Sequence, residues 1–262
     1  MPTGWKRRRG RRCFWCSRAS PSSGSSTAEA AMLHLDRLLI RQGDFTLRAD
    51  ATACAGERIA VIGPSGGGKS TLLMAIAGFL APAEGRILWQ GRDLGPLGPG
   101  ERPVSLLFQD QNLFPHLTLR ENLGLGISPA LRLAAGDRAR IAEALERVGL
   151  AGLGEAKPGR LSGGQQGRAA LARALLRARP ILLLDEPFAA LGPALKAEML
   201  ALVSEIAAET GATVLMVTHD PEDARRFAHR TILVADGRAE APQPTAALFA
   251  DPPPALRAYL GP

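Results

Sequence analysis

The clearest chemical signal in this chain is a loop that reads G-x-x-x-x-G-K-S, formed by Gly63, Pro64, Ser65, Gly66, Gly67, Gly68, Lys69 and Ser70. An apolar run precedes the loop and a helical pattern follows it. Glycines let successive backbone N–H groups turn toward one anion, and the positive end of the following helix adds to the attraction. An ordinary glycine-rich turn is the alternative. Because Lys69 can reach outer phosphates and the Ser70 hydroxyl can bind Mg²⁺, the pattern predicts a phosphate-binding loop.

A pair of carboxylates, Asp185 and Glu186, follows the apolar run 181–184. Asp185 can hold Mg²⁺ directly or through water. Glu186 can polarise a water molecule aimed at a γ-phosphate. Such a pair is also common as a helix cap, so its weight comes from its combination with the phosphate-binding loop.

Two further segments are weaker alone. Leu161-Ser-Gly-Gly-Gln165 precedes an Ala- and Leu-rich helical pattern, so Ser162 can cap that helix while its glycines leave N–H groups open to an anion. His219 follows the apolar run 212–218, where a single histidine is more often structural. Asp220 and Pro221 then read as the N-cap and first residue of the next helix.

Five apolar runs of strand length alternate with helical patterns, which predicts a parallel sheet covered by helices on both faces. A glycine-bounded segment predicts an added antiparallel strand. Between residues 114 and 160 the pattern changes to helix and loop, with a capping box at Thr118 and an amphipathic helix over 137–149. We therefore expect a helical subdomain inserted into the sheet domain. The five runs are 58–62, 104–108, 181–184, 212–218 and 231–235, and the added strand is 85–91.

The net charge of +7 is concentrated at the N-terminus. Residues 1–31 contain seven lysines and arginines and a single acid, so the rest of the chain carries +1. A basic nucleic-acid-binding face is therefore not expected. The segment 1–31 lacks the apolar core of an export signal. A transit peptide or a phosphate-binding arm is an alternative, but the composition favours a disordered basic extension upstream of a natural start at Met32.

Three cysteines give limited information. Cys13 and Cys16 form a lone C-x-x-C without further metal ligands at zinc spacing, and Cys54 lies in an apolar stretch that predicts a buried thiol. Few cysteines together with a nucleotide site favour the reducing cytoplasm. No uncharged apolar run approaches the roughly 18 residues that span a bilayer.

Read together, these motifs resemble those of ATP-binding-cassette (ABC) transporter ATPases, with residues 161–165 as the family signature and the resemblance covering 32 to about 237. It implies an α/β P-loop NTPase fold: a RecA-like parallel-sheet core, an antiparallel β subdomain and an inserted helical subdomain. Residues 238–262 would form a short C-terminal tail. It also implies a homodimer in which ATP and Mg²⁺ lie between one subunit's phosphate loop and the other's signature.

The resemblance also assigns roles to single residues. It implies catalytic roles for Lys69, Glu186 and His219, and Mg²⁺ contacts from Ser70, Gln109 and Asp185. The nucleotide would be bound by residues of the phosphate loop, of the segment after strand 104–108, and of the signature: Gly63, Pro64, Ser65, Gly66, Gly67, Gly68, Lys69, Ser70, Thr71, Gln109, Ser162, Gly163, Gly164 and Gln165.

Three positions depart from the family pattern. Gly192 stands where an Asp is usual, and we expect its absence to lower hydrolysis. Gln166 and Gly167 replace an Arg-Gln pair after the signature. Ile40 or Gln42 occupies the place of an adenine-stacking aromatic, with Phe45 as a candidate substitute.

The resemblance implies that the chain acts together with a separate transmembrane permease, as in bacterial importers, because no membrane span is fused to it. The subunit would be peripheral on the cytoplasmic face of the inner membrane, and a periplasmic substrate-binding protein would act through the permease. Residues 78–80, 102–126 and 187–194 resemble the ATPase subunits of thiamine importers. Importers of iron or polyamines, a soluble ABC ATPase acting on DNA or ribosomes, and a module that holds ATP without turnover remain alternatives.

Overall fold

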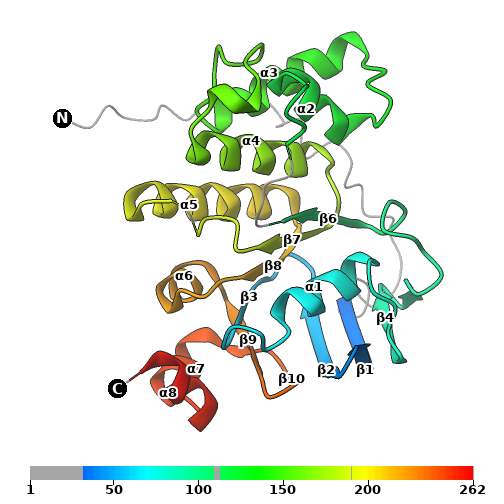
Figure 1. Ribbon diagram of the computed structural model, residues 1–262, viewed down its shortest axis with the longest axis vertical. Helices are drawn as coiled ribbons and strands as arrows, with labels where there is room; N and C mark the ends of the chain where they lie inside the picture. Colours follow the sequence, from blue (N-terminus) through cyan, green and yellow to red (C-terminus); the bar gives the residue numbers. More distant parts are fainter. Residues whose placement is uncertain (1–31, 109–112, 190, 262) are drawn as a thin grey trace.

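The computed structural model describes residues 32–108, 113–189 and 191–261. The predicted basic extension 1–31 and Gln109 lie outside these ranges. The described part of the chain is built on an eleven-stranded mixed sheet with the order β5-β4-β1-β2-β10-β9-β3-β8-β7-β6, and β11 pairs with β9. Figure 1 shows this sheet between a group of helices at one end of the molecule and the C-terminal helices at the other.

The predicted parallel sheet is confirmed. Its neighbouring strands β6, β7, β8, β3 and β9 pair in parallel. Helices cover both faces of this part of the sheet, so nearly every side chain along these strands is apolar and buried. All five predicted runs correspond to strands to within one residue at each end. These are β3 (Arg58–Ile62), β6 (Val104–Leu107), β7 (Ile181–Asp185), β8 (Thr213–Val217) and β9 (Arg230–Ala235).

An antiparallel part extends the sheet beyond β9 and confirms the predicted antiparallel subdomain. It contains β1 (Met32–Gln42), β2 (Phe45–Cys54), β4 (Glu84–Trp89) and β5 (Arg92–Asp93). Side chains alternate along β2 between the core and solvent, and Cys54 lies on the solvent side. The prediction of a buried Cys54 thiol was wrong because the alternation, rather than the apolar neighbours, decides the exposure of that side chain.

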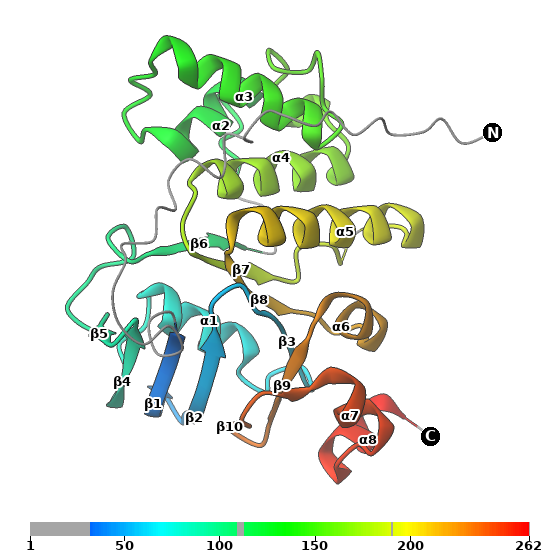
Figure 2. The ribbon, with the colours of Figure 1, turned by 180° about the vertical axis from the view of Figure 1, so that it is seen from behind.

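Helices cover the two faces of the sheet. On one face, α1 (Lys69–Ala77) packs Leu72, Leu73 and Ile76 against β1, β2 and β3. On the other face lie α4 (Gly163–Leu176) and α5 (Pro193–Thr210), which pack against β7 and β8. Figures 1 and 2 show α1 and α5 on opposite sides of the sheet, with α4 stacked beyond α5.

The inserted helices have a core of their own. They comprise α2 (Leu119–Ile127), α3 (Ala135–Arg147), the short 3₁₀ helix η2 (Pro158–Arg160) and one side of α4. Thr118 and Glu121 form the predicted capping box at α2. Helix α3 begins two residues before the predicted 137–149, ends at Arg147 and buries Ile141 and Leu145 on one face, as an amphipathic helix should.

The C-terminal residues fold onto the sheet. They form β10 (Arg238–Ala239), β11 (Gln243–Pro244), α7 (Thr245–Ala250) and α8 (Pro254–Leu260). Leu248 and Leu256 are buried in a cluster with Ala60, Ile62 and Leu233. The helix α6 (Pro221–Phe227) lies beside them, so the segment expected to be a tail is part of the packed structure (Figure 2).

A buried arginine stabilises the end of α1. The Arg102 side chain donates hydrogen bonds to the carbonyl groups of Ala75 (2.8 Å), Ile76 (2.9 Å) and Leu97 (3.0 Å). The residue is 2% exposed, and burial lowers the pKa of its guanidinium. Gly78 ends the helix with φ 91°, and a Cβ there would lie 2.6 Å from Arg102 Nε. Only glycine at position 78 leaves room for the Arg102 side chain, and Arg102 in turn supplies hydrogen bonds to the end of α1.

We predict that Arg102→Ala lowers the free energy of unfolding by about 3 kcal/mol, because the buried Ile76 carbonyl loses its guanidinium donor and the Ala75 carbonyl keeps only the Gly78 N–H. Urea denaturation measures the difference. The exposed Arg92 on β5 is a matched control, and Arg92→Ala should change stability by less than about 0.5 kcal/mol. Equal losses in the two variants would contradict this account of Arg102.

Candidate functional site

The predicted chemical residues gather at the carboxyl ends of three parallel strands. The phosphate loop follows β3, Asp185 ends β7, and His219 follows β8 by two residues. Since β3, β8 and β7 are neighbours in the sheet, these ends lie side by side. Ligands of open α/β sheets bind at this edge.

Glycine is required in the phosphate loop. Gly63 has φ +145°, and a Cβ there would lie 1.9 Å from the carbonyl oxygen of Val234. Gly68, with φ +104°, is the N-cap of α1 and provides no side chain to the N–H groups of the first turn. Those N–H groups are consequently available to an anion at the positive end of the helix.

Lys69 is folded back into the loop that it follows. Its Nζ donates hydrogen bonds to the carbonyl groups of Gly63 (2.8 Å) and Pro64 (2.9 Å), and the residue is 7% exposed. Burial lowers the pKa of the ammonium group, while Glu186 and Asp185 oppose that shift. An anionic ligand in the loop would stabilise the charged form of this buried lysine.

Two of the three predicted metal ligands, Ser70 and Asp185, are in contact. Ser70 Oγ donates a hydrogen bond to Asp185 Oδ1 at 3.1 Å. Burial raises the pKa of Asp185, Ser70 and Lys69 lower it, and Glu186 raises it further. A hydroxyl and one carboxylate are oxygen ligands suited to Mg²⁺ that is also bound by phosphates. The third predicted ligand, Gln109, lies outside the described residues.

Glu186 and His219 form the second part of the site. His219 Nδ1 lies 3.1 Å from Glu186 Oε2. Glu186 has φ +44°, an uncommon conformation for a residue with a side chain, and its N–H donates to the carbonyl of Val217 at 3.1 Å. The neighbouring strand thus fixes the backbone of Glu186. With the His219 side chain 56% exposed, the pair is open to solvent beside the phosphate loop.

Tyr259 on α8 also reaches this site, and sequence reasoning missed it. Its hydroxyl donates a hydrogen bond to the carbonyl of His219 at 2.5 Å. Burial raises the pKa of Tyr259, and the charges of Glu186 and Asp220 add to the shift. It is the only tyrosine in the chain, but that fact alone does not indicate where its hydroxyl lies.

The predicted signature is placed elsewhere. Ser162 caps α4, accepting a hydrogen bond from the backbone N–H of Gln165 (3.3 Å), and Gln165 Oε1 accepts one from the Ser162 N–H (2.9 Å). Among the described residues, a Cβ on Gly163 would meet nothing within 4 Å, so they leave this N-terminus open. Helix α4 covers the face of the sheet opposite α1. The structure therefore unites Lys69 and Ser70 with the acidic pair and His219, but not with the signature.

The three positions that depart from the family pattern have different surroundings in the structure. Gly192 is the N-cap of α5 with φ −67°, and a Cβ there would meet none of the described residues within 4 Å, so these residues leave room for an Asp side chain. Gln166 Nε2 donates to the carbonyl groups of Pro158 and Leu161, both at 3.2 Å.

Among the candidates for adenine stacking, Ile40 is 1% exposed in the core, which excludes it. Phe45 lies against the phosphate loop, because a Cβ on Gly68 would be 2.8 Å from its ring. Phe45 is therefore an untested candidate for this role, and Gln42 is exposed at the end of β1.

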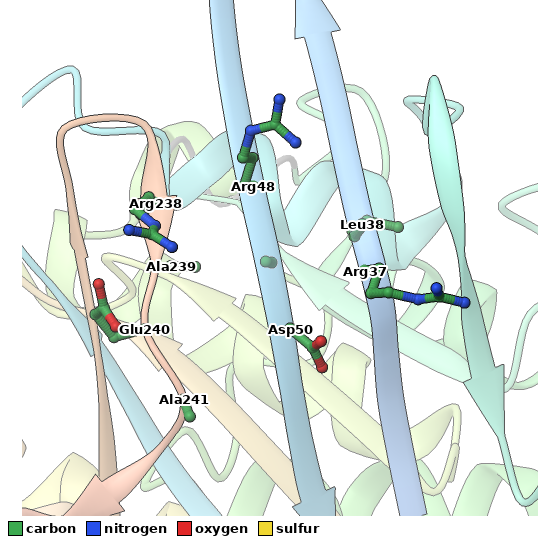
Figure 3. A pocket seen from close by; sticks show the side chains of 9 residues that line it. Arg37, Leu38, Arg48, Asp50, Arg238, Ala239, Glu240 and Ala241 are labelled. Atoms are coloured by element: carbon green, nitrogen blue, oxygen red, sulfur yellow. The ribbon is translucent and has the colours of Figure 1, made fainter.

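A pocket of about 360 Å³ lies away from the predicted site residues, on the outer face of β1, β2 and β10. Figure 3 shows Arg37 on β1, Arg48 and Asp50 on β2, and Arg238 and Glu240 on the C-terminal segment. Acidic and basic side chains occur there together, and none belongs to a predicted motif.

Comparison with known proteins identifies the family. The sequence profile of the ABC transporter family matches residues 48–189. The chain belongs to the ABC transporter family. It is 61% identical over 230 residues to the thiamine import ATP-binding protein ThiQ of Ruegeria sp. (strain TM1040), covering 88% of this chain and all of that protein. The protein of the same name from Jannaschia sp. (strain CCS1) is 49% identical, with coverage of 87% and 100%.

Solved structures agree with this family. A dimeric bacterial ABC transporter cassette is 33% identical with a TM-score of 0.72, covering 81% of this chain and 98% of that one. A dimeric cassette in a post-hydrolysis state, bound to ADP and Pi, gives a TM-score of 0.71 at the same identity and coverage. The predicted ABC ATPase fold and ATPase activity are thereby confirmed. Within the described residues, no helix has the length and apolar content needed to cross a membrane.

We predict that Tyr259→Phe lowers the kcat of ATP hydrolysis about fivefold and leaves KM for ATP unchanged. The substitution removes the hydrogen bond to the His219 carbonyl, worth about 1 kcal/mol, and so loosens the position of the His219 side chain without affecting nucleotide binding. Steady-state kinetics of the isolated and assembled subunit measure both constants. In a His219→Ala background, Tyr259→Phe should have no further effect. An equal loss in both backgrounds would show that Tyr259 acts on folding rather than on His219.

Proposed function

We propose that this chain is the ATPase subunit of a bacterial importer for thiamine or its phosphates, acting on the cytoplasmic face of the inner membrane. The observation that carries the proposal is the 61% identity to a thiamine import ATP-binding protein along all of that protein's length. The contacts of the phosphate loop, the acidic pair and His219 support turnover by the same residues.

The geometry suggests how these residues would act on ATP. The loop N–H groups and Lys69 would bind the β- and γ-phosphates. Ser70 and Asp185 would hold Mg²⁺, which neutralises charge between those phosphates when bound. Glu186 would accept a proton from the attacking water, and His219, 3.1 Å from that carboxylate, would donate a hydrogen bond to the γ-phosphate.

Pairing of two copies would complete the site. The open N-terminus of α4 at Gly163 can face a phosphate group, but it does not join the phosphate loop of its own chain. A head-to-tail homodimer would bring the signature of one chain to the nucleotide of the other. A relative that is 33% identical has been solved as a dimer.

A groove between α4 and the end of β6 is the proposed docking site of the permease. It has a volume of about 250 Å³ and is lined by residues that include Phe108, Phe114, Leu125 and Arg173. Phe114 is 46% exposed, and only Phe79 is a comparably exposed large apolar residue in the described ranges. A groove with an exposed aromatic side chain beside it can receive a partner's side chains, which supports the proposed docking site.

The loop that carries Phe114 is fixed by a buried amide. Asn122 is 0% exposed, accepts a hydrogen bond from the Phe114 N–H (2.8 Å) and donates to the Phe114 carbonyl (3.1 Å). Such a preformed aromatic contact suits a partner that must transmit a rigid-body movement.

The direct test is reconstitution with a thiamine permease and a periplasmic thiamine-binding protein. We expect ATP hydrolysis that is stimulated by the loaded binding protein and coupled to thiamine uptake. Phe114→Asp should abolish the stimulation while leaving hydrolysis by the isolated subunit within about twofold of wild type, because the charge disrupts docking and not the nucleotide site. Stimulation only by an iron- or polyamine-binding protein with its permease would assign a different cargo.

We predict that Gly192→Asp raises the ATPase rate of the assembled transporter, because the open space at this N-cap admits a carboxylate that can reach across the proposed dimer. The Gly192→Ala variant adds a side chain without the carboxylate and should leave the rate unchanged. Equal rates in Gly192→Asp and wild type would discard the idea that the missing carboxylate limits turnover.

A further inference from the structure

A cavity of about 380 Å³ lies at the opposite edge of the sheet from the phosphate loop. The amino-terminal ends of β6, β7 and β8 contribute Ser105, Leu182 and Val214, and the last turns of α4 and α5 contribute residues such as Leu175 and Ile206. Most of the lining is aliphatic. Its volume falls within the range of small-molecule sites.

Ser105 gives this apolar cavity an unsatisfied polar group. Side chains alternate along β6, so Val104 joins the core on the α1 face while Ser105 faces α4 and α5. Ser105 is 2% exposed, and its hydroxyl has no hydrogen-bond partner among the described residues. A buried hydroxyl without a partner costs about 1–3 kcal/mol. A bound molecule with a hydrogen-bonding oxygen would remove this cost.

The lining is also positively charged. Among the described residues that line the cavity, Arg179 is the only charged one. The guanidinium groups of Arg177 and Arg179 donate to the same acceptor, the carbonyl of Gly100, at 3.2 and 3.5 Å. Neither has a carboxylate within 4 Å among the described residues. An anionic group would therefore be favoured beside Arg179.

We propose that this cavity, defined by Ser105, Arg179 and the aliphatic residues around them, binds a small amphiphilic carboxylate. The apolar body fills the space between the sheet and the ends of α4 and α5. The carboxylate pairs with Arg179, and an oxygen of the ligand accepts a hydrogen bond from Ser105 Oγ.

Occupation of the cavity should affect ATP hydrolysis, a consequence that rests on the proposed function. The elements that line the cavity carry residues of the proposed nucleotide site at their opposite ends. Helix α4 begins after Ser162, α5 begins after Gly192, and β7 ends at Asp185. A ligand that fixes the two helices against the sheet would restrict their movement relative to the phosphate loop. We therefore expect it to slow hydrolysis.

Two matched probes test the site on the full chain: 4-phenylbutanoate and the neutral 4-phenylbutan-1-ol, titrated by calorimetry. The carboxylate should bind saturably and about tenfold more tightly than the alcohol, and Arg179→Gln should remove that advantage. Ser105→Ala should weaken binding about fivefold without lowering the melting temperature, since the substitution removes an unsatisfied hydroxyl.

A variant that fills the cavity with a larger side chain tests most directly whether the probes bind there. Ala207 is buried and lines the cavity, whereas Ala208 is its exposed neighbour on α5. Ala207→Leu should abolish binding of both probes, and Ala208→Leu should retain it. Circular dichroism verifies the fold, and Ala212→Leu is a second filling variant if Ala207→Leu does not fold.

Absence of saturable binding in the millimolar range, or equal binding by Ala207→Leu and wild type, would overturn the site. The carboxylate should slow ATP hydrolysis at least about twofold at the concentration that saturates the cavity. Binding without this effect would overturn the regulatory part of the proposal. If the chain hydrolyses no ATP under any condition, the proposed function fails, while the calorimetry still decides whether the cavity binds the carboxylate.

Discussion

The structure depends on the close approach of the phosphate loop to its own sheet. Gly63 lies where any side chain would overlap the carbonyl oxygen of Val234 on the neighbouring strand β9. This contact turns the chain sharply out of β3 and places Lys69 at the start of α1, with its ammonium group against the loop carbonyl groups. A buried cation and a row of open N–H groups then face the same space, which suits a chain of phosphates.

The parallel strands bring the remaining groups to that space. Ser70 meets Asp185 because β3 and β7 flank β8, and the N–H of Glu186 is held by Val217 at the end of β8. The C-terminal helix adds the hydrogen bond from Tyr259 to the carbonyl of His219. Lys69 is thus positioned by carbonyl groups of its own loop, whereas Ser70 and His219 contact carboxylates that the sheet brings from another strand end.

Sequence reasoning succeeded where local chemistry decides the structure. The five buried strands, the caps at Thr118 and Ser162 and the turn at Gly63 follow from side-chain polarity and backbone freedom over a few residues. It failed for Cys54, whose exposure depends on the register of β2. It also missed Tyr259, which meets His219 from 40 residues away, and the docking of the C-terminal helices, because such contacts are set by packing and not by pattern.

The central claim is that ATP is enclosed only when two copies of the chain meet, since the open N-terminus of α4 does not join the phosphate loop of its own chain. The most direct measurement is the mass of a Glu186→Gln variant in the presence of ATP and Mg²⁺, by light scattering or native mass spectrometry. The account predicts a particle of twice the chain mass that disappears without nucleotide. Single chains alone, with the permease present as well as absent, would contradict it.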